Sequence, residues 1–128
     1  MRPKTLSVLI VTAMLSVPLT ASADMLDVIR TSLNNGCSME KYLAVIDDFN
    51  AYYKDKGYQT EILQPLHSEL GSGVVIWVGR AASFEAFGKA YDHWQVELDK
   101  PGSTVSKLSA RFEECTTTLS RSSYMTAK

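Results

Sequence analysis

The spacing of apolar side chains predicts two long helices. In the segment 38–57, apolar residues recur at the helical period, Ser38 is a suitable N-cap and Gly57 a suitable end. The inward stripe of this helix comprises Met39, Tyr42, Leu43, Ile46, Phe49 and Tyr53. The second helix would begin after Ser83, and its stripe comprises Phe84, Phe87, Gly88, Tyr91, Gln95 and Leu98, with Trp94 on the flank. Each helix is expected to bury one face against a sheet.

Four further segments have the pattern of strands, and a short helical turn precedes the last of them. Residues 25–33 are rich in apolar and β-branched side chains, and residues 58–66 alternate. Residues 74–78 are an unbroken apolar run, which indicates a central strand covered on both faces. A short helical turn over 103–108 should lead into a last strand that starts near Phe112 and reaches Leu119 or Met125. This order predicts an α+β fold of the ferredoxin-like βαββαβ type, with a short extra helix before the last strand.

The first 23 residues have the order of a secretory signal peptide. Arg2 and Lys4 are basic, residues 6–17 are mainly apolar, and Ala21-Ser22-Ala23 is typical of a cleavage site. The apolar run is shorter than the roughly 20 residues that cross a bilayer. We therefore expect cleavage after Ala23 and a periplasmic or secreted protein without stable membrane insertion. An uncleaved anchor is the alternative.

Residues 24–128 are expected to form one domain with few electrostatic features. The chain of 128 residues carries 13 basic and 14 acidic side chains, for a formal net charge of −1. Neither sign forms a run or stripe. Because binding to nucleic acid or to an anionic membrane depends on clustered basic charge, we expect neither as a partner.

The two cysteines, Cys37 and Cys115, are predicted to form a disulfide. Paired cysteines are the usual state in exported proteins, with free thiols as the alternative, and two thiols alone cannot make a structural zinc site. In the ferredoxin-like arrangement the first and last strands are antiparallel neighbours. Cys37 follows the first strand and Cys115 lies near the expected start of the last, so the topology would bring them to one edge.

Two long segments resemble a known superfamily. NNGCSMEKYLAVIDDFNAYY (34–53) and VIWVGRAASFEAFGKAYDHW (75–94), with a two-strand hairpin between them, resemble the dimeric α/β-barrel superfamily. That superfamily includes the antibiotic-biosynthesis-monooxygenase and NIPSNAP-like domains. The resemblance covers about residues 25–125 and rests on element order and on an aromatic residue at a strand end before a Phe-containing helix. It implies a homodimer packed sheet to sheet, with a pocket between the sheet and helices of each subunit.

The haem-degrading branch of that superfamily resembles the chain only in outline. That branch uses an Asn on the first strand, a Trp on the second helix and a His ten positions later. The corresponding helix positions here hold Phe87 and Glu97, and Asn34 and Asn35 come at the end of the strand instead of its beginning. The resemblance therefore implies no haem site, and we expect neither a cofactor nor a metal.

A pocket between helices and sheet would be lined by aromatic residues. Gly88 on the buried stripe favours close approach of a strand or a ligand, since glycine otherwise weakens a helix. Buried tyrosine hydroxyls require partners, which a ligand could supply. The residues expected to line the pocket are Tyr42, Tyr53, Trp77, Tyr91 and Trp94.

Other side chains capable of chemistry have ordinary explanations. His67 follows a strand near an edge and is expected to be exposed, and His93 is about 160° from the inward stripe of its helix. Asp47 and Asp48 point about 100° apart, which favours a solvated face over an acid–base pair. Arg80, after the central strand, is expected to be a surface cation, or else to meet an anionic ligand at a pocket mouth. No catalytic residue is predicted.

Three functions are consistent with these patterns. The first is a non-catalytic exported domain that dimerises and binds a small apolar or aromatic ligand. The second is a structural or interaction role in the cell envelope, which a specific partner in a pull-down would favour. The third, which the superfamily resemblance implies, is a cofactor-independent monooxygenase-type enzyme.

Overall fold

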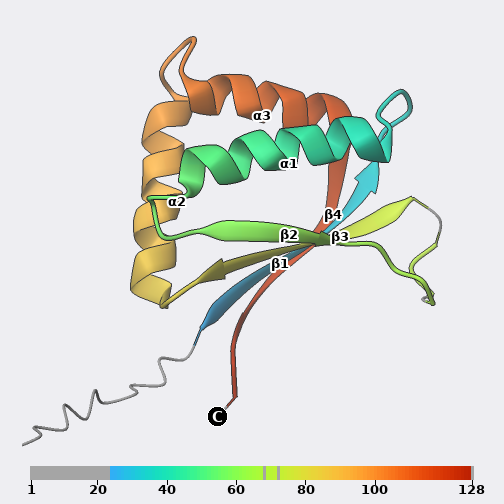
Figure 1. Cartoon of the computed structure of the whole chain (residues 1–128), viewed down its shortest axis with the longest axis horizontal. Coiled ribbons are helices and arrows are strands. Elements are labelled where there is room, and N and C mark those ends of the chain that lie inside the picture. Colours follow the sequence, from blue (N-terminus) through green and yellow to red (C-terminus); the bar gives the residue numbers. More distant parts are fainter. Residues whose placement is uncertain (1–23, 68, 72, 128) are drawn as a thin grey trace, which may run out of the picture.

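The computed structural model describes residues 24–67, 69–71 and 73–127 (Figure 1). Along the chain the elements are β1 (Met25–Leu33), α1 (Met39–Tyr53), β2 (Gln59–Leu63), β3 (Val74–Ala81), α2 (Phe84–Leu98), α3 (Thr104–Cys115) and β4 (Thr116–Met125). The described strands form one antiparallel sheet in the order β2-β3-β1-β4. This is the ferredoxin-like α+β fold that the element order predicts. The predicted signal peptide lies outside the described residues.

The first and last strands are antiparallel neighbours, as the cysteine positions required. Met25 pairs with Met125 and Leu33 with Thr116, and the register shifts between Arg30 and Thr31. On its other side β1 pairs with β3, where Ile29 faces Trp77. β1 is therefore an inner strand of the sheet.

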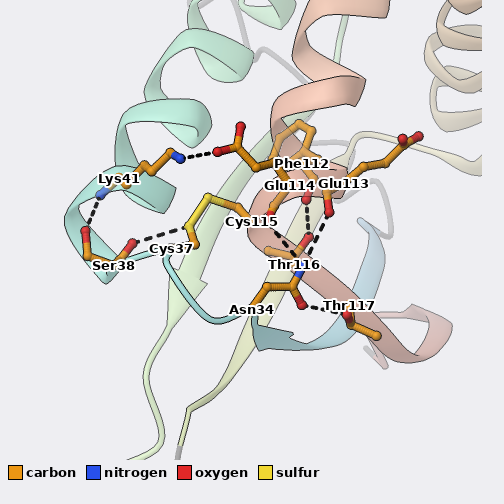
Figure 2. Close-up of a disulfide and its surroundings, with 10 residues drawn as sticks. All are labelled: Asn34, Cys37, Ser38, Lys41, Phe112, Glu113, Glu114, Cys115, Thr116 and Thr117. Atoms are coloured by element: carbon orange, nitrogen blue, oxygen red, sulfur yellow. Dashed lines mark hydrogen bonds and ion pairs between the residues drawn. A yellow bond between two sulfur atoms is a disulfide. The ribbon is translucent and has the colours of Figure 1, made fainter.

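The predicted disulfide joins the loop after β1 to the end of α3 (Figure 2). The Cα atoms of Cys37 and Cys115 are 5.0 Å apart. Beside them the backbone N–H of Asn34 donates to the Cys115 carbonyl at 2.8 Å. The side-chain amide of Asn34 donates to the carbonyls of Glu113 and Glu114 (Figure 2). The covalent bond and these hydrogen bonds fix one end of the helix layer to the sheet.

The last strand begins later than the sequence predicted, because α3 continues to Cys115. The apolar residues Val105, Leu108, Phe112 and Cys115 recur every three or four positions, which is a helical period. Ser103 caps the helix by accepting a hydrogen bond from the N–H of Ser106. The extra helix is therefore a full one, and the prediction of a strand from Phe112 was wrong.

β2 is also shorter than predicted and ends at Leu63. Leu66, which the sequence placed at the end of this strand, is 88% exposed. Pro65 has no N–H to donate to a ladder, which is consistent with the strand ending before it. Within β2, Thr60 is buried, and its hydroxyl donates to the carbonyl of Val78.

The helices lie on one side of the sheet (Figure 1). Because strand side chains alternate, β1 and β3 direct one set of residues toward the helices and the other set away. No described helix covers that second side, where Val78 is buried but Val74 and Ile76 are only partly buried, so the prediction that β3 is covered on both faces holds only in part within one chain. We call this second side the open face; it includes Leu26, Val28, Arg30, Val74, Ile76, Val78 and Arg80.

Candidate ligand-binding site

A cavity of about 260 Å³ lies between the helices and the sheet, and we call it the aromatic cavity. Its lining comes from every helix and from three strands. The sheet contributes Asp27, Ile29, Thr31, Trp77, Thr116, Thr118 and Arg121, and Tyr58 immediately precedes β2. The helices contribute Tyr42, Phe49 and Tyr53 from α1, Phe87, Ala90, Tyr91, Trp94 and Gln95 from α2, and Phe112 from α3.

Phe49 is the centre of the aromatic lining. Its ring centre lies 4.7 Å from that of Tyr53 and 4.9 Å from that of Trp77. The rings of Trp94 and Phe112 lie 5.8 and 6.0 Å away. These are the offset and edge-to-face separations at which aromatic pairs attract each other beyond simple burial. The wall is therefore preorganised by side chains from α1, β3, α2 and α3.

The side of α2 that faces the cavity is shifted from the predicted stripe: Phe87, Tyr91 and Gln95 line the cavity as expected, but Ala90 joins them and Phe84 does not. Ala90 is its buried residue, whereas Phe84 is 49% exposed and Tyr91 is 43% exposed. The Ala90 carbonyl accepts a hydrogen bond from the Tyr53 hydroxyl of α1 at 3.0 Å. That bond fixes the rotation of the helix, and the hydrophobic pattern alone could not reveal it. Gly88 has no close neighbour that a Cβ would meet, so its predicted role in close approach was wrong.

His93 does not point into solvent as the sequence suggested. Its Nε2 lies 2.7 Å from the Tyr52 hydroxyl, and the two rings stack with centres 5.8 Å apart. Burial and the nearby Glu97 raise the pKa of Tyr52. The contact joins α1 to α2 outside the cavity, because neither residue belongs to its lining.

The remaining singled-out side chains lie outside the cavity. His67 is exposed, as predicted. Arg80 pairs with Glu61 at 3.1 Å on the open face, so it is a surface cation and not a group at the cavity mouth. Asp47 and Asp48 are both exposed, and Asp48 pairs with Arg111 of α3.

A buried chain of hydrogen bonds meets one end of the cavity. Asp27 is fully buried, and its carboxylate accepts two bonds from Arg121, from Nε at 2.8 Å and from Nη2 at 2.7 Å. It also accepts a bond from the Tyr58 hydroxyl at 2.8 Å, which in turn accepts one from Trp77 Nε1 at 2.8 Å. A buried carboxylate is tolerated when it is paired and fully hydrogen-bonded. Asp27 meets both conditions.

The charges and burial of this hydrogen-bond network keep the Tyr58 hydroxyl protonated. Burial raises the pKa of the Tyr58 hydroxyl, and the neighbouring Asp27 charge raises it further. The same carboxylate raises the pKa of Arg121 through its two hydrogen bonds. The Arg121 guanidinium also lies 5.6 Å from the centre of the Tyr91 ring and 5.9 Å from that of Phe87. The guanidinium is thus held between the Asp27 carboxylate and the rings of Phe87 and Tyr91 from α2.

Gly79 leaves the space that the Tyr58 ring occupies in this hydrogen-bond network. A Cβ built on Gly79 would lie 1.8 Å from the Tyr58 oxygen and 2.3 Å from its ring carbon Cζ. In the sheet Gly79 pairs with Asp27 of β1 and with Thr60 of β2. The Tyr58 ring therefore crosses β3 over the bare glycine to reach Asp27. The close approach that the sequence analysis assigned to Gly88 is made here.

Two hydroxyls in another part of the cavity have no hydrogen-bond partner among the described residues. Tyr42 is only 1% exposed and Thr31 only 4%, and both line the cavity. Within the described residues neither the Tyr42 hydroxyl nor the Thr31 hydroxyl makes a hydrogen bond, although Tyr42 contacts Phe112 edge to face. Burial raises the pKa of Tyr42 to about 12. Both hydroxyls are available to a molecule in the cavity.

The five residues expected to line a pocket, Tyr42, Tyr53, Trp77, Tyr91 and Trp94, all line this cavity. That they bind a ligand stays a prediction. Asp27, Tyr58, Gly79 and Arg121 were not predicted from the sequence. A signal for Asp27 was present, because a period of two places this carboxylate on the same strand face as Met25, Ile29 and Thr31.

In the described part of the chain, no group of three or more His, Cys, Asp or Glu residues is placed to hold a metal ion. Among the described helices, none has the length and apolar character to span a membrane.

Comparisons with known proteins give the fold and nothing finer. No protein-family model and no curated protein matches the chain. It is similar to the solved structure of SnoaB, described as a cofactor-independent oxygenase from Streptomyces nogalater, with a TM-score of 0.59 and 12% identity over 83% of this chain and 95% of that one. A dimeric protein of unknown function and ferredoxin-like fold from Bacteroides fragilis gives a TM-score of 0.44 and 12% identity, over 80% and 96%.

Proposed function

We propose that the protein binds a small apolar or aromatic ligand in the aromatic cavity and does not transform it. The observation that carries the proposal is the preformed cavity of about 260 Å³ with its aromatic walls. An apolar cavity of roughly 150 Å³ is enough to hold benzene, so this one can hold a larger compound. Asp27 and Tyr58 hydrogen-bond each other and thus serve the structure, which favours binding over chemistry.

Tryptophan fluorescence can test this proposal directly, because Trp77 and Trp94 both line the cavity. We expect compounds from a panel of aromatic ligands to quench this fluorescence and to raise the melting temperature. Ala90→Leu places extra atoms in the cavity and should weaken binding by about tenfold or more. Ala51→Leu on the exposed side of α1 is the matched control and should leave affinity unchanged. Failure of the whole panel to bind would refute the proposal.

We also propose that two copies associate through the open face. Val28 and Ile76 are partly exposed apolar side chains there, next to the buried Val78. Ile76→Lys should convert a dimer into a monomer in sedimentation analysis. Val96→Lys, at an exposed apolar position on α2, should not. A wild-type monomer at micromolar concentration would exclude this association.

Export is the third part of the proposal, and it rests on the signal-peptide pattern of residues 1–23. Intact-mass spectrometry of protein from cells should give a chain that begins at Asp24, with the mass of two hydrogens missing because of the disulfide. A chain that still contains the first residues would contradict cleavage.

A cofactor-independent oxygenase is the second candidate. The fold shared with SnoaB and the polar chain at one end of an aromatic cavity favour it. Turnover of quinol-type substrates, abolished by changing Trp94 or Tyr91, would replace the binding proposal with this one. Absence of turnover for substrates that do bind would exclude it.

A further inference from the structure

We propose that the ligand of the aromatic cavity is a neutral, planar compound of about two fused aromatic rings that carries an oxygen at each end. This inference deepens the proposed binding function and rests on it. It follows from the size of the cavity, from its charge balance and from the position of its polar groups.

The size of the cavity sets the number of rings. One ring fits a cavity of roughly 150 Å³. The aromatic cavity measures about 260 Å³ and has flat walls formed by Phe49, Trp77 and Trp94. Two fused rings fill such a space and can stack on these walls, whereas a single ring would leave part of it empty.

The charge balance of the cavity disfavours ions. Its charged lining residues are Asp27 and Arg121, and they neutralise each other through two hydrogen bonds. Burial raises the pKa values of Tyr42, Tyr53 and Tyr58, so these hydroxyls stay neutral at pH 7. The glutamine and threonine side chains of the lining carry no charge. An anion placed against Arg121 would also lie close to the buried Asp27 carboxylate, and a cation would meet the guanidinium. Either ion would lose its hydration for little net attraction, which a neutral compound avoids.

Two sets of polar groups in the lining lie well apart along β1. Asp27 and Thr31 are four residues apart on β1, which separates their Cα atoms by roughly 13 Å. In the first set Arg121 uses Nε and Nη2 for Asp27, so that Nη1 can donate to a ligand oxygen. In another part of the cavity the hydroxyls of Tyr42 and Thr31 make no hydrogen bond within the described residues, and neither oxygen is fully buried, so both are open to a ligand. A carbonyl or hydroxyl oxygen at each end of the ligand would satisfy both sites.

Four matched probes test the inference by calorimetry at pH 7: naphthalene, a naphthalenediol with hydroxyls at opposite ends, and two analogues in which one hydroxyl becomes a carboxylate or an aminomethyl group. We expect the diol to bind about tenfold or more tightly than each of the other three. Equal or tighter binding of either ion, or of naphthalene, would overturn the inference and leave the cavity proposal standing. If no probe and no panel compound binds, the cavity proposal fails as well.

Asp27→Asn sharpens the test, because it keeps the shape of the side chain and leaves the Arg121 charge unbalanced. We expect the carboxylate probe to gain about tenfold relative to the diol in this variant. Asp24→Asn removes the same charge from an exposed position and should change neither affinity. An unaltered preference in folded Asp27→Asn protein would overturn the charge argument. If the variant does not fold, the wild-type series alone decides.

Discussion

The two faces of one sheet differ in what they can do. The face under the helices holds an aromatic cavity with a neutralised ion pair, whereas the open face presents apolar side chains with Arg80 and Glu61 at its border. β1 contributes to both, since Asp27 points to the cavity and Val28 points away. The difference shows how one strand can contribute to a binding site on one face and to an association surface on the other. Alternation of side chains separates the two roles.

The largest expected effect on stability comes from removing the disulfide, which lies on the helix-covered side of the sheet. Replacing both Cys37 and Cys115 by Ala should lower the free energy of unfolding by up to about 4.5 kcal/mol, because the bond closes a long loop in the unfolded chain. The sequence separation of the two residues is 78. Urea denaturation of the oxidised wild type and of the double variant measures the difference. A loss below about 1 kcal/mol would show that the helix layer does not depend on this bond.

The second prediction compares two glycines. Gly79→Ala should cost about 3 kcal/mol, because the new Cβ displaces the Tyr58 ring and breaks its bonds to Asp27 and Trp77. Gly88→Ala is the control, since open space surrounds that position. Because alanine favours a helix, this variant should gain up to about 1 kcal/mol. Thermal unfolding of both variants decides, and equal losses at the two sites would contradict the role given to Gly79.

The third prediction compares neighbouring valines on opposite faces of β3. Val75 is 1% exposed and points to the helices, whereas Val74 belongs to the open face. Val75→Ser should cost about 2 kcal/mol through a cavity and a buried hydroxyl. Val74→Ser should cost less than about 0.5 kcal/mol in the unfolding of the separate chain. Similar costs would mean that the two faces are equally buried in solution.

Much of the fold could be predicted from the sequence, because helical stripes, caps and the two cysteines are local signals or fixed topological constraints. Ser38 and Ser83 cap their helices as expected. The errors have physical causes. The rotation of α2 depends on the bond between Tyr53 and Ala90, and the extent of α3 depends on the apolar period that ends at Cys115.

The candidate site was predictable only in its aromatic residues, which amphipathic periods place on inward faces. The hydrogen-bond network of Asp27, Tyr58 and Arg121 could not be predicted, because it joins residues that are far apart in the sequence. Asp27 and Arg121 meet because β1 and β4 pair, and the register of that pairing brings Ile29 opposite Arg121. No local pattern contains this register.

The smallest expected effect is on the alkaline limit of stability. The folded pKa of Tyr42 is raised to about 12, above the ordinary value of 10.0, because of burial. Its contribution is therefore fully present below pH 10 and is lost as the pH rises toward 12. At pH 11, Tyr42→Phe should recover about 1 kcal/mol of the stability that the wild type loses relative to pH 9. Unfolding curves at the two pH values measure this, and an identical loss in the variant would contradict it.

The most direct test of the account is a nuclear magnetic resonance titration of the folded protein with the naphthalenediol. The account predicts that the indole N–H signals of Trp77 and Trp94 and the Arg121 Nε–H signal shift together and saturate at one ligand per chain. The methyl signals of Val28 and Ile76 on the open face should not move. Shifts confined to the open face, or no saturable shift at all, would contradict the claim that the helix-covered side is the binding site.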